Sequence, residues 1–375
     1  MTATRSAWTR LARRGNAPLD ALARTTIVVA GRSWAAFQVC GGAGILLGSS
    51  LVVFLAARDG LALWLIAAMI AVAVTVFLAV ALLTLRIGGA EKLVYYHHEV
   101  AVLVAAATFV RATGTSPLPY LDVFVLGLGM FLACGRLGCL MVGCCHGRPG
   151  AWGIRYRAEH ADAGFTPYYV DVRLIPVQAL ESLAVLVIVG AGVALAIGPH
   201  RPGAVLVWYL GAYGVTRIAL EFLRGDPDRR YWCGVSEAQW TSLLQIVSVA
   251  ASATSAWPAA AVAAVMLAFA RARGYRVTHP PHVRELWTAI QSARNGEAAR
   301  GVAVATTSLG VRISAGRLHY TISQRDEPLS NRTARTLARM ILDLGRHPPA
   351  FSRLVRGRNE TFHLLTGASG RSVTR

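Results

Sequence analysis

Residues 118–142, LPYLDVFVLGLGMFLACGRLGCLMV, form an apolar run broken by only two charged side chains, Asp122 and Arg136. The run is longer than the ~20 residues that a helix needs to cross the hydrocarbon core of a bilayer. Six more apolar runs of this kind lie at 35–57, 61–86, 94–110, 176–198, 203–222 and 240–270. The sequence therefore predicts an all-α multi-span membrane protein with about seven transmembrane helices. Very short loops make neighbouring helices antiparallel.

The composition agrees with a membrane protein. Hydrophobic residues make up 54% of the 375 residues and charged residues only 15%, against roughly 25% charged in soluble domains. The net charge of +19 lies mostly in two segments: residues 1–34 hold six arginines and one aspartate, and residues 271–375 hold 18 arginines and six acids. Such tails can meet anionic lipid headgroups, and nucleic acid is the other partner that their charge allows.

The chain is thus divided into a basic N-terminal tail (1–34), a transmembrane domain (35–270) and a basic tail domain (271–375). Within the tail domain, residues 283–293 have a helical pattern, and 310–314 with 318–323 predict a hairpin. Ser330 is expected to cap a helix whose apolar stripe is Leu337, Ile341 and Leu344. These elements predict a small soluble α+β domain.

Charged side chains inside the predicted spans mark a candidate site, because each costs roughly 2.5–3.5 kcal/mol to insert. The polar residues in question are His97, His98, Glu99, Asp122, Arg136, Glu181, Arg217 and Glu221. Alternating helix directions place all of them except Asp122 in the same half of the bilayer, on the side of the long loop at 143–175. We therefore expect one polar chamber with two arginines that opens to one leaflet.

The two arginines allow two interpretations. Arg217, Glu221 and Arg224 are spaced i, i+4, i+7 and form one stripe on a helix, so Arg217 and Glu221 could be an ion pair that lets the span insert. Alternatively, Arg136 and Arg217 bind a lipid phosphate from two helices, since a planar guanidinium suits that geometry. Glu181 is the other acid well inside the chamber.

His97 and His98 are candidate bases. Because they are adjacent, at most one of them can face the chamber from a helix. Near neutral pH a histidine could take a proton from an incoming thiol or hydroxyl. The alternative is a neutral histidine at the membrane interface.

A cysteine cluster follows the fourth span, at Cys139, Cys144 and Cys145 before His146. Metal ligation is one interpretation, although a vicinal cysteine pair followed by histidine is not a usual zinc spacing. A redox pair of Cys139 and Cys144 is the second. The third is small residues that allow close helix packing beside neighbouring glycines.

Three blocks of residues 30–270 resemble the bacterial prolipoprotein diacylglyceryl transferase family. Gly135-Arg136-Leu137-Gly138, followed by Gly143, is similar to the family signature at the end of the fourth span. Ile175-Pro176-Val177-Gln178-Ala179-Leu180-Glu181 resembles the His-Pro-Ser-Gln-Leu-Tyr-Glu block. The third block comprises Tyr213-Gly214, Arg217, Glu221-Phe222-Leu223-Arg224 and Asp226, and Trp152-Gly153-Ile154 resembles a loop motif of the family. The chain departs from the family at Cys139 and Cys144, where the family has Asn and Glu, and at His97-His98-Glu99, where it has His-Gly-Gly.

The resemblance implies transfer of a diacylglyceryl group from phosphatidylglycerol to the lipobox cysteine of prolipoproteins. It implies a bacterial plasma-membrane enzyme with an external active site and a cytosolic tail domain. Arg136 and Arg217 would stabilise the departing phosphate, Glu181 and Glu221 would orient them, and His97 or His98, or alternatively Glu99, would take the thiol proton. The substrate-binding residues would be Arg136, Gly138, Cys139, Gln178, Arg217 and Arg224. Membrane lipids are the expected surroundings; no cofactor, metal or nucleic acid is expected.

Two other functions are compatible with the residues. One is a membrane thiol oxidoreductase built on Cys139, Cys144 and Cys145. The other is a non-catalytic protein that binds anionic lipid and recruits a partner through its basic tail, where Arg332, Arg335 and Arg339 lie together on one helix.

Overall fold

A computed structural model describes residues 15–88, 95–252, 254–274, 276–298, 303–316, 319–345, 351–358 and 360–367. Residues 1–14 of the predicted basic tail lie outside these ranges. The chain forms two compact units, of which the first contains residues 1–165, 171–224 and 230–272. The second contains residues 273–375 together with two short segments, 166–170 and 225–229.

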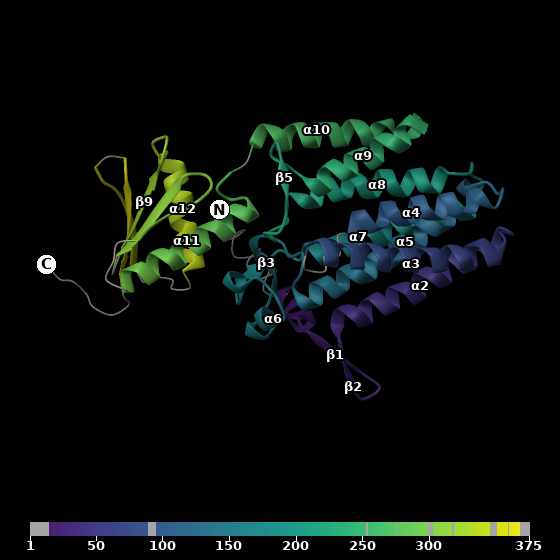
Figure 1. Cartoon of the computed structure of the whole chain (residues 1–375), viewed down its shortest axis with the longest axis horizontal. Coiled ribbons are helices and arrows are strands. Elements are labelled where there is room, and N and C mark those ends of the chain that lie inside the picture. Colours follow the sequence, from purple (N-terminus) through teal and green to yellow (C-terminus); the bar gives the residue numbers. More distant parts are fainter. Residues whose placement is uncertain are drawn as a thin grey trace, which may run out of the picture. The chain divides into compact units, whose positions relative to one another are not determined.

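The first unit is a bundle of helices (Figure 1). Its long helices are α2 (Ala36–Arg58), α3 (Leu63–Gly88), α4 (Tyr95–Ala112), α5 (Pro117–Val142), α7 (Val177–Ile197), α8 (Ala204–Glu221), α9 (Glu237–Ser252) and α10 (Trp257–Arg273). The first six agree with the predicted spans to within about two residues at each end. Among the described residues, α2, α3, α5 and α7 are long and apolar enough to cross a membrane.

The prediction of a single span over 240–270 is wrong. That stretch consists of two helices, α9 and α10, which are separated by a 3₁₀ turn at Thr254–Ala256. Pro258 lies in the first turn of α10, where a missing backbone N–H has no cost. Continuous apolar character concealed the break, because neither the turn nor the start of α10 contains a charged residue.

Helix α10 returns to the end of the bundle at which α8 finishes. A Cβ atom on Gly211 would lie 3.7 Å from the Ala259 side chain. Further along both helices, the ring centroids of Phe222 and Phe269 are 6.0 Å apart. Helices α8 and α10 are therefore parallel, and the chain leaves the first unit at the face where the chamber was predicted. An external chamber and a cytosolic tail domain are incompatible with this arrangement.

Helix α5 is the centre of the bundle. Of its apolar stretch 67% is buried, against 22–39% for α2, α3 and α7. It crosses α2 closely, since a Cβ atom on Gly48 would lie 2.6 Å from the carbonyl oxygen of Gly127. Small residues at such a crossing let two helix backbones approach and gain van der Waals contact.

Gly48→Ala is expected to destabilise the protein, by about 1–3 kcal/mol, because the new methyl group meets backbone that cannot rotate away. Thermal unfolding of the full chain in detergent measures the loss. Gly41→Ala is the matched control on the same helix, since none of the described residues comes within 4 Å of a Cβ atom at that position. Equal unfolding temperatures for the two variants would contradict the proposed close crossing.

Short elements cover the chamber face. They are β1 (Thr26–Val29), β2 (Arg32–Ala35), β3 (Pro149–Arg155), α6 (Ala158–Asp162), β4 (Arg173–Leu174), β5 (Tyr231–Trp232) and β6 (Val235–Ser236). A 3₁₀ turn (Pro167–Tyr169) in the same loop belongs to the second unit. The N-terminal segment is attached to the 143–175 loop, because Asn16 accepts a hydrogen bond from the Gly153 amide at 2.9 Å. Asp20 pairs with Arg173 at 2.9 Å. Part of the predicted tail is thus an ordered cover over this loop.

The second unit is a small α+β fold. Its elements are α11 (Pro280–Ala298), β7 (Val304–Thr306), β8 (Val311–Gly316), β9 (His319–Gln324), α12 (Asn331–Leu344), β10 (Phe351–Arg356) and β11 (Phe362–Gly367). The strands form an antiparallel sheet in the order β10-β11-β9-β8-β7. The predicted hairpin is confirmed, and so is the cap on α12, where the Ser330 side chain accepts a hydrogen bond from the Thr333 amide.

Candidate functional site

Three helices bring charged side chains together around one carboxylate. Glu181 lies near the start of α7 and is only 1% exposed. Its Oε2 atom lies 3.0 Å from Nε of Arg136 on α5, and its Oε1 atom lies 3.8 Å from Nε of Arg217 on α8. The two arginines that the sequence placed in one half of the bilayer therefore converge on the same group.

Arg217 has a second partner on its own helix. Its Nη1 atom donates a hydrogen bond of 2.6 Å to Oε2 of Glu221, one turn further along α8. The predicted intrahelical ion pair is therefore present, and Arg217 also faces Arg136 across Glu181. Binding of a lipid phosphate by the two arginines stays a prediction. Among the described residues, none accepts a hydrogen bond from the Nη atoms of Arg136. This end of the guanidinium is the part suited to an anionic ligand.

A stripe of four polar side chains on α8 contributes to the site. Tyr209, Tyr213, Arg217 and Glu221 follow one another at i, i+4 spacing, and all four are buried. The Tyr213 hydroxyl donates a hydrogen bond of 3.0 Å to Glu181, and the rings of Tyr209 and Tyr213 stack with centroids 5.8 Å apart. Sequence reasoning missed Tyr209, although the four-residue period was present and could have identified it.

Glu99 belongs to the same polar interior. Oε1 lies 3.4 Å from the Tyr95 hydroxyl, which itself lies 3.5 Å from that of Tyr209. Oε2 accepts a hydrogen bond of 3.0 Å from Gln245 on α9. The contact to Gln245 ties α4 to α9, and neither Tyr95 nor Gln245 was predicted from the sequence.

The two histidines point to different neighbours, as adjacent helical positions require. His97 is at the surface, where Nε2 lies 3.0 Å from a carboxylate oxygen of Glu237. His98 is buried, with its ring centroid 4.5 Å from that of Phe77 on α3. Of the two, His98 is the one inside the bundle.

Asp122 lies at the opposite end of the bundle and has a structural task. Its carboxylate accepts hydrogen bonds from the backbone amides of Gly203 at 2.6 Å and Leu206 at 2.8 Å. These amides belong to the start of α8, whose first N–H groups lack partners within the helix. Asp122 is therefore a helix cap, and it lies outside the site.

Three further residues predicted to bind substrate have structural contacts. Gln178 donates a hydrogen bond of 2.8 Å to the carbonyl of Cys144 and so fixes the loop after α5. Gly138 faces α2, where a Cβ atom would come within 3.0 Å of Cys40. The backbone carbonyl of the buried residue Arg224 accepts a hydrogen bond of 3.0 Å from Nε of Arg148.

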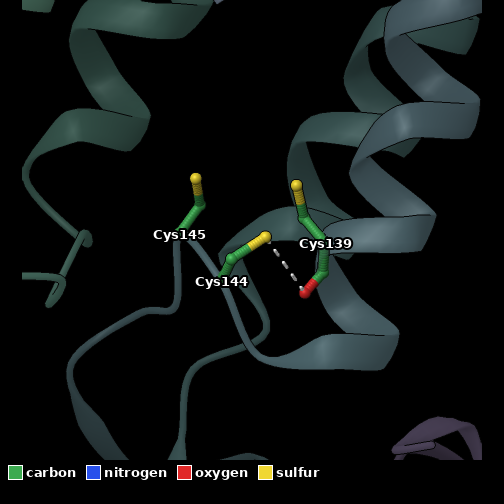
Figure 2. Close-up of side chains that lie close together, drawn as sticks. All are labelled: Cys139, Cys144 and Cys145. Carbon is green, nitrogen blue, oxygen red and sulfur yellow. Dashed lines mark hydrogen bonds between the residues drawn. The ribbon is translucent and has the colours of Figure 1, made fainter. Parts of the chain in front are cut away.

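Cys139, Cys144 and Cys145 form a cluster in which the three sulfur atoms all lie within 4.8 Å of one another. Figure 2 shows Cys139 on the last turns of α5 and the other two on the loop that follows, with the Cys144 sulfur directed to the Cys139 carbonyl. The pKa of the Cys145 thiol is lowered, mainly by hydrogen bonds with the thiols of Cys139 and Cys144. Burial acts in the opposite direction, and the positive charges of Arg224 and Arg136 lower the pKa further. The arrangement can hold a metal ion or form a disulfide.

An apolar cavity of about 220 Å³ lies among α2, α3, α4 and α5. It is lined by aliphatic and aromatic side chains, including Phe77, Phe124 and Phe131, and by Gly44 and Gly48. Phe77 also contacts His98, so the cavity adjoins the buried histidine.

Comparison with known proteins identifies the helical unit. The model of the family "Prolipoprotein diacylglyceryl transferase" matches residues 93–255. A phosphatidylglycerol–prolipoprotein diacylglyceryl transferase of Dehalococcoides mccartyi is 32% identical over 126 residues, 34% of this chain and 46% of that protein. One from Clostridium tetani is 31% identical over 130 residues, 35% of this chain and 50% of that protein. The chain thus spans about half the length of the curated relatives it matches. Over residues 93–255 the chain is thus recognised as a divergent relative of the prolipoprotein diacylglyceryl transferase family.

Proposed function

We propose that the protein transfers a diacylglyceryl group from phosphatidylglycerol to the lipobox cysteine of prolipoproteins. The observation that carries the proposal is the convergence of Arg136 and Arg217, from two helices, on Glu181 at one end of the bundle. Two guanidinium groups held in place at this depth are suited to a phosphate that enters from the neighbouring leaflet.

The reaction is a displacement at a saturated carbon. The thiol sulfur bonds to the glyceryl CH₂ of the lipid, the bond from that carbon to the phosphate oxygen breaks, and glycerol phosphate leaves. The thiol proton must pass to a base, and the leaving phosphate must be stabilised as its charge develops. The products are a thioether on the acceptor peptide and a free phosphate ester.

This chain offers candidate residues both for stabilising the leaving phosphate and for taking the thiol proton. We assign phosphate stabilisation to Arg136 and Arg217, with Glu181 and Glu221 holding their guanidinium groups before substrate arrives. Among the histidines we assign the base to His98, because it is buried within the bundle whereas His97 pairs with Glu237 at the surface. The apolar cavity beside Phe77 offers a place for part of one acyl chain.

Besides the His97-His98-Glu99 segment, the site departs from the family at Cys139 and Cys144. Neither cysteine contributes to the pairs among Arg136, Glu181, Arg217 and Glu221. We therefore propose that the phosphate-binding part of the reaction is retained. We also propose that the chamber is external, which places the exit of the chain toward the tail domain on that side as well.

Complementation tests the function. The chain should restore growth and lipoprotein processing in a bacterium depleted of its own transferase. In vitro, the purified chain in phosphatidylglycerol vesicles should add one diacylglyceryl mass to a lipobox peptide. A peptide with serine in place of its cysteine is the control and should stay unmodified. A folded, membrane-inserted chain that modifies no peptide in either assay would refute the proposal.

A further inference from the structure

The cysteine cluster has a geometry that does not depend on the proposed transferase activity. Its three sulfur atoms lie within 4.8 Å of one another. Three thiolates around one metal at about 2.3 Å, the usual zinc–sulfur distance, would lie about 4 Å apart. The sulfurs therefore need to move by less than about 1 Å to bind a common ion.

The backbone holds the three cysteines in this arrangement. Gly143 ends α5 with φ +87°, and a Cβ atom there would lie 2.8 Å from the Phe165 ring. Cys145 itself has φ +54°, a left-handed conformation that residues other than glycine rarely adopt. The Cys144 carbonyl is held by Gln178. A loop fixed in this way orients its ligands before an ion binds, which lowers the entropic cost of binding.

Two arginines act on the cluster. Arg136 lies one turn before Cys139 on α5, and the positive charges of both Arg136 and Arg224 act on Cys145. Both guanidinium groups also act on Glu181, so they offset only part of the negative charge that bound thiolates would bring.

The donor set selects the kind of ion. All three donors are sulfur, and among the described residues no histidine or carboxylate joins the cluster. His146 is the next residue, but its ring nitrogens are not part of the group of donor atoms that lie within 4.8 Å of one another. Soft thiolates bind both Zn²⁺ and Cu⁺, but structural zinc takes four ligands whereas Cu⁺ accepts three.

We propose that Cys139, Cys144 and Cys145 bind one Cu⁺ ion as a three-coordinate thiolate site. Each sulfur that forms a bond to the ion loses its thiol proton to solvent, and no electron is transferred. The Cys144 thiol must give up its hydrogen bond to the Cys139 carbonyl when it loses its proton. That bond is weak, because the sulfur and the oxygen are 4.0 Å apart, so its loss costs little.

Titration with Cu⁺ tests the site. The full chain in detergent, reduced and free of oxygen, is titrated with Cu⁺ against a chromogenic Cu⁺ chelator. We expect one Cu⁺ per chain to be withheld from the chelator, with Zn²⁺ unable to displace it. Cys144→Ser should weaken binding at least tenfold, and because Cys144 is exposed this variant should fold normally. The matched control is the triple variant Cys40→Ser, Cys134→Ser, Cys233→Ser, which should bind as the unmodified chain does.

Three outcomes would overturn the proposal. In the first, Cys144→Ser and Cys145→Ser both bind Cu⁺ as tightly as the unmodified chain. In the second, Zn²⁺ displaces the ion at equal concentration. In the third, the reduced chain binds no Cu⁺ but a mild oxidant joins Cys139 to Cys144, as peptide mass mapping would reveal, so that the cluster is a redox pair.

Discussion

Arg136→Ala is expected to lower the rate of diacylglyceryl transfer by about 10²- to 10³-fold, the usual loss when one preorganised donor to a developing anion is removed. Arg136 is 6% exposed, and its ion pair with Glu181 runs through Nε. The Nη nitrogens are therefore the part that we assign to the lipid phosphate. The measurement is kcat/KM for a lipobox peptide in phosphatidylglycerol vesicles.

Two variants sharpen this prediction. Arg136→Lys keeps the charge but loses the planar fork, so it should recover only part of the rate. Arg155→Ala removes an exposed arginine from the loop on the same face and should leave the rate unchanged. If Arg136→Ala retains a kcat/KM within threefold of the unmodified protein, Arg136 does not bind the phosphate.

Glu181→Ala is expected to reduce the free energy of unfolding by about 3–5 kcal/mol, because removing one member of a buried ion pair leaves the opposite charge uncompensated. The effect should be large here, since Glu181 faces both Arg136 and Arg217 and also accepts a hydrogen bond from Tyr213. Thermal unfolding of the detergent-solubilised chain is the measurement.

The controls for Glu181 separate burial from charge. Glu159→Ala removes an acid whose side chain is 60% exposed and should change stability little. Glu181→Gln keeps the size and an acceptor for Tyr213, so a similar loss in this variant would show that the charge matters. A stability within 1 kcal/mol of the unmodified protein for Glu181→Ala would mean that the two arginines find other partners.

Much of the helical unit could be predicted because hydropathy determines where a chain enters a membrane. The bounds of α2, α3, α4, α5, α7 and α8 follow apolar runs that end in charged or glycine-containing loops. Alternating helix directions then group Arg136, Glu181 and Arg217 at one end of the bundle. That grouping depends only on connectivity and on the rise of 1.5 Å per residue.

The break between α9 and α10 could not be predicted in this way. Hydropathy reports where side chains avoid water and says little about where an apolar chain turns inside a bundle. The same limit applies to the crossing of Gly48 over Gly127, which depends on how two helices approach.

Within the site, side-chain direction was the missing information. Sequence spacing identified Arg217 and Glu221 as one stripe, but it could not tell that the Arg217 pair also reaches Glu181 on another helix. His97 and His98 were equivalent by sequence, and only their packing distinguishes them. The sequence also did not show that the turn at Gly143 folds Cys144 and Cys145 back toward Cys139.

The return of α10 has a consequence for the thiols. Residues 273–375 contain no cysteine, so the second unit can fold in a reducing or an oxidising compartment alike. The cysteine cluster lies at the end of the bundle where the chain leaves for that unit, and disulfides persist only where the surroundings are oxidising. Finding the side of the membrane that holds the C-terminus would therefore also establish whether glutathione keeps Cys139, Cys144 and Cys145 reduced.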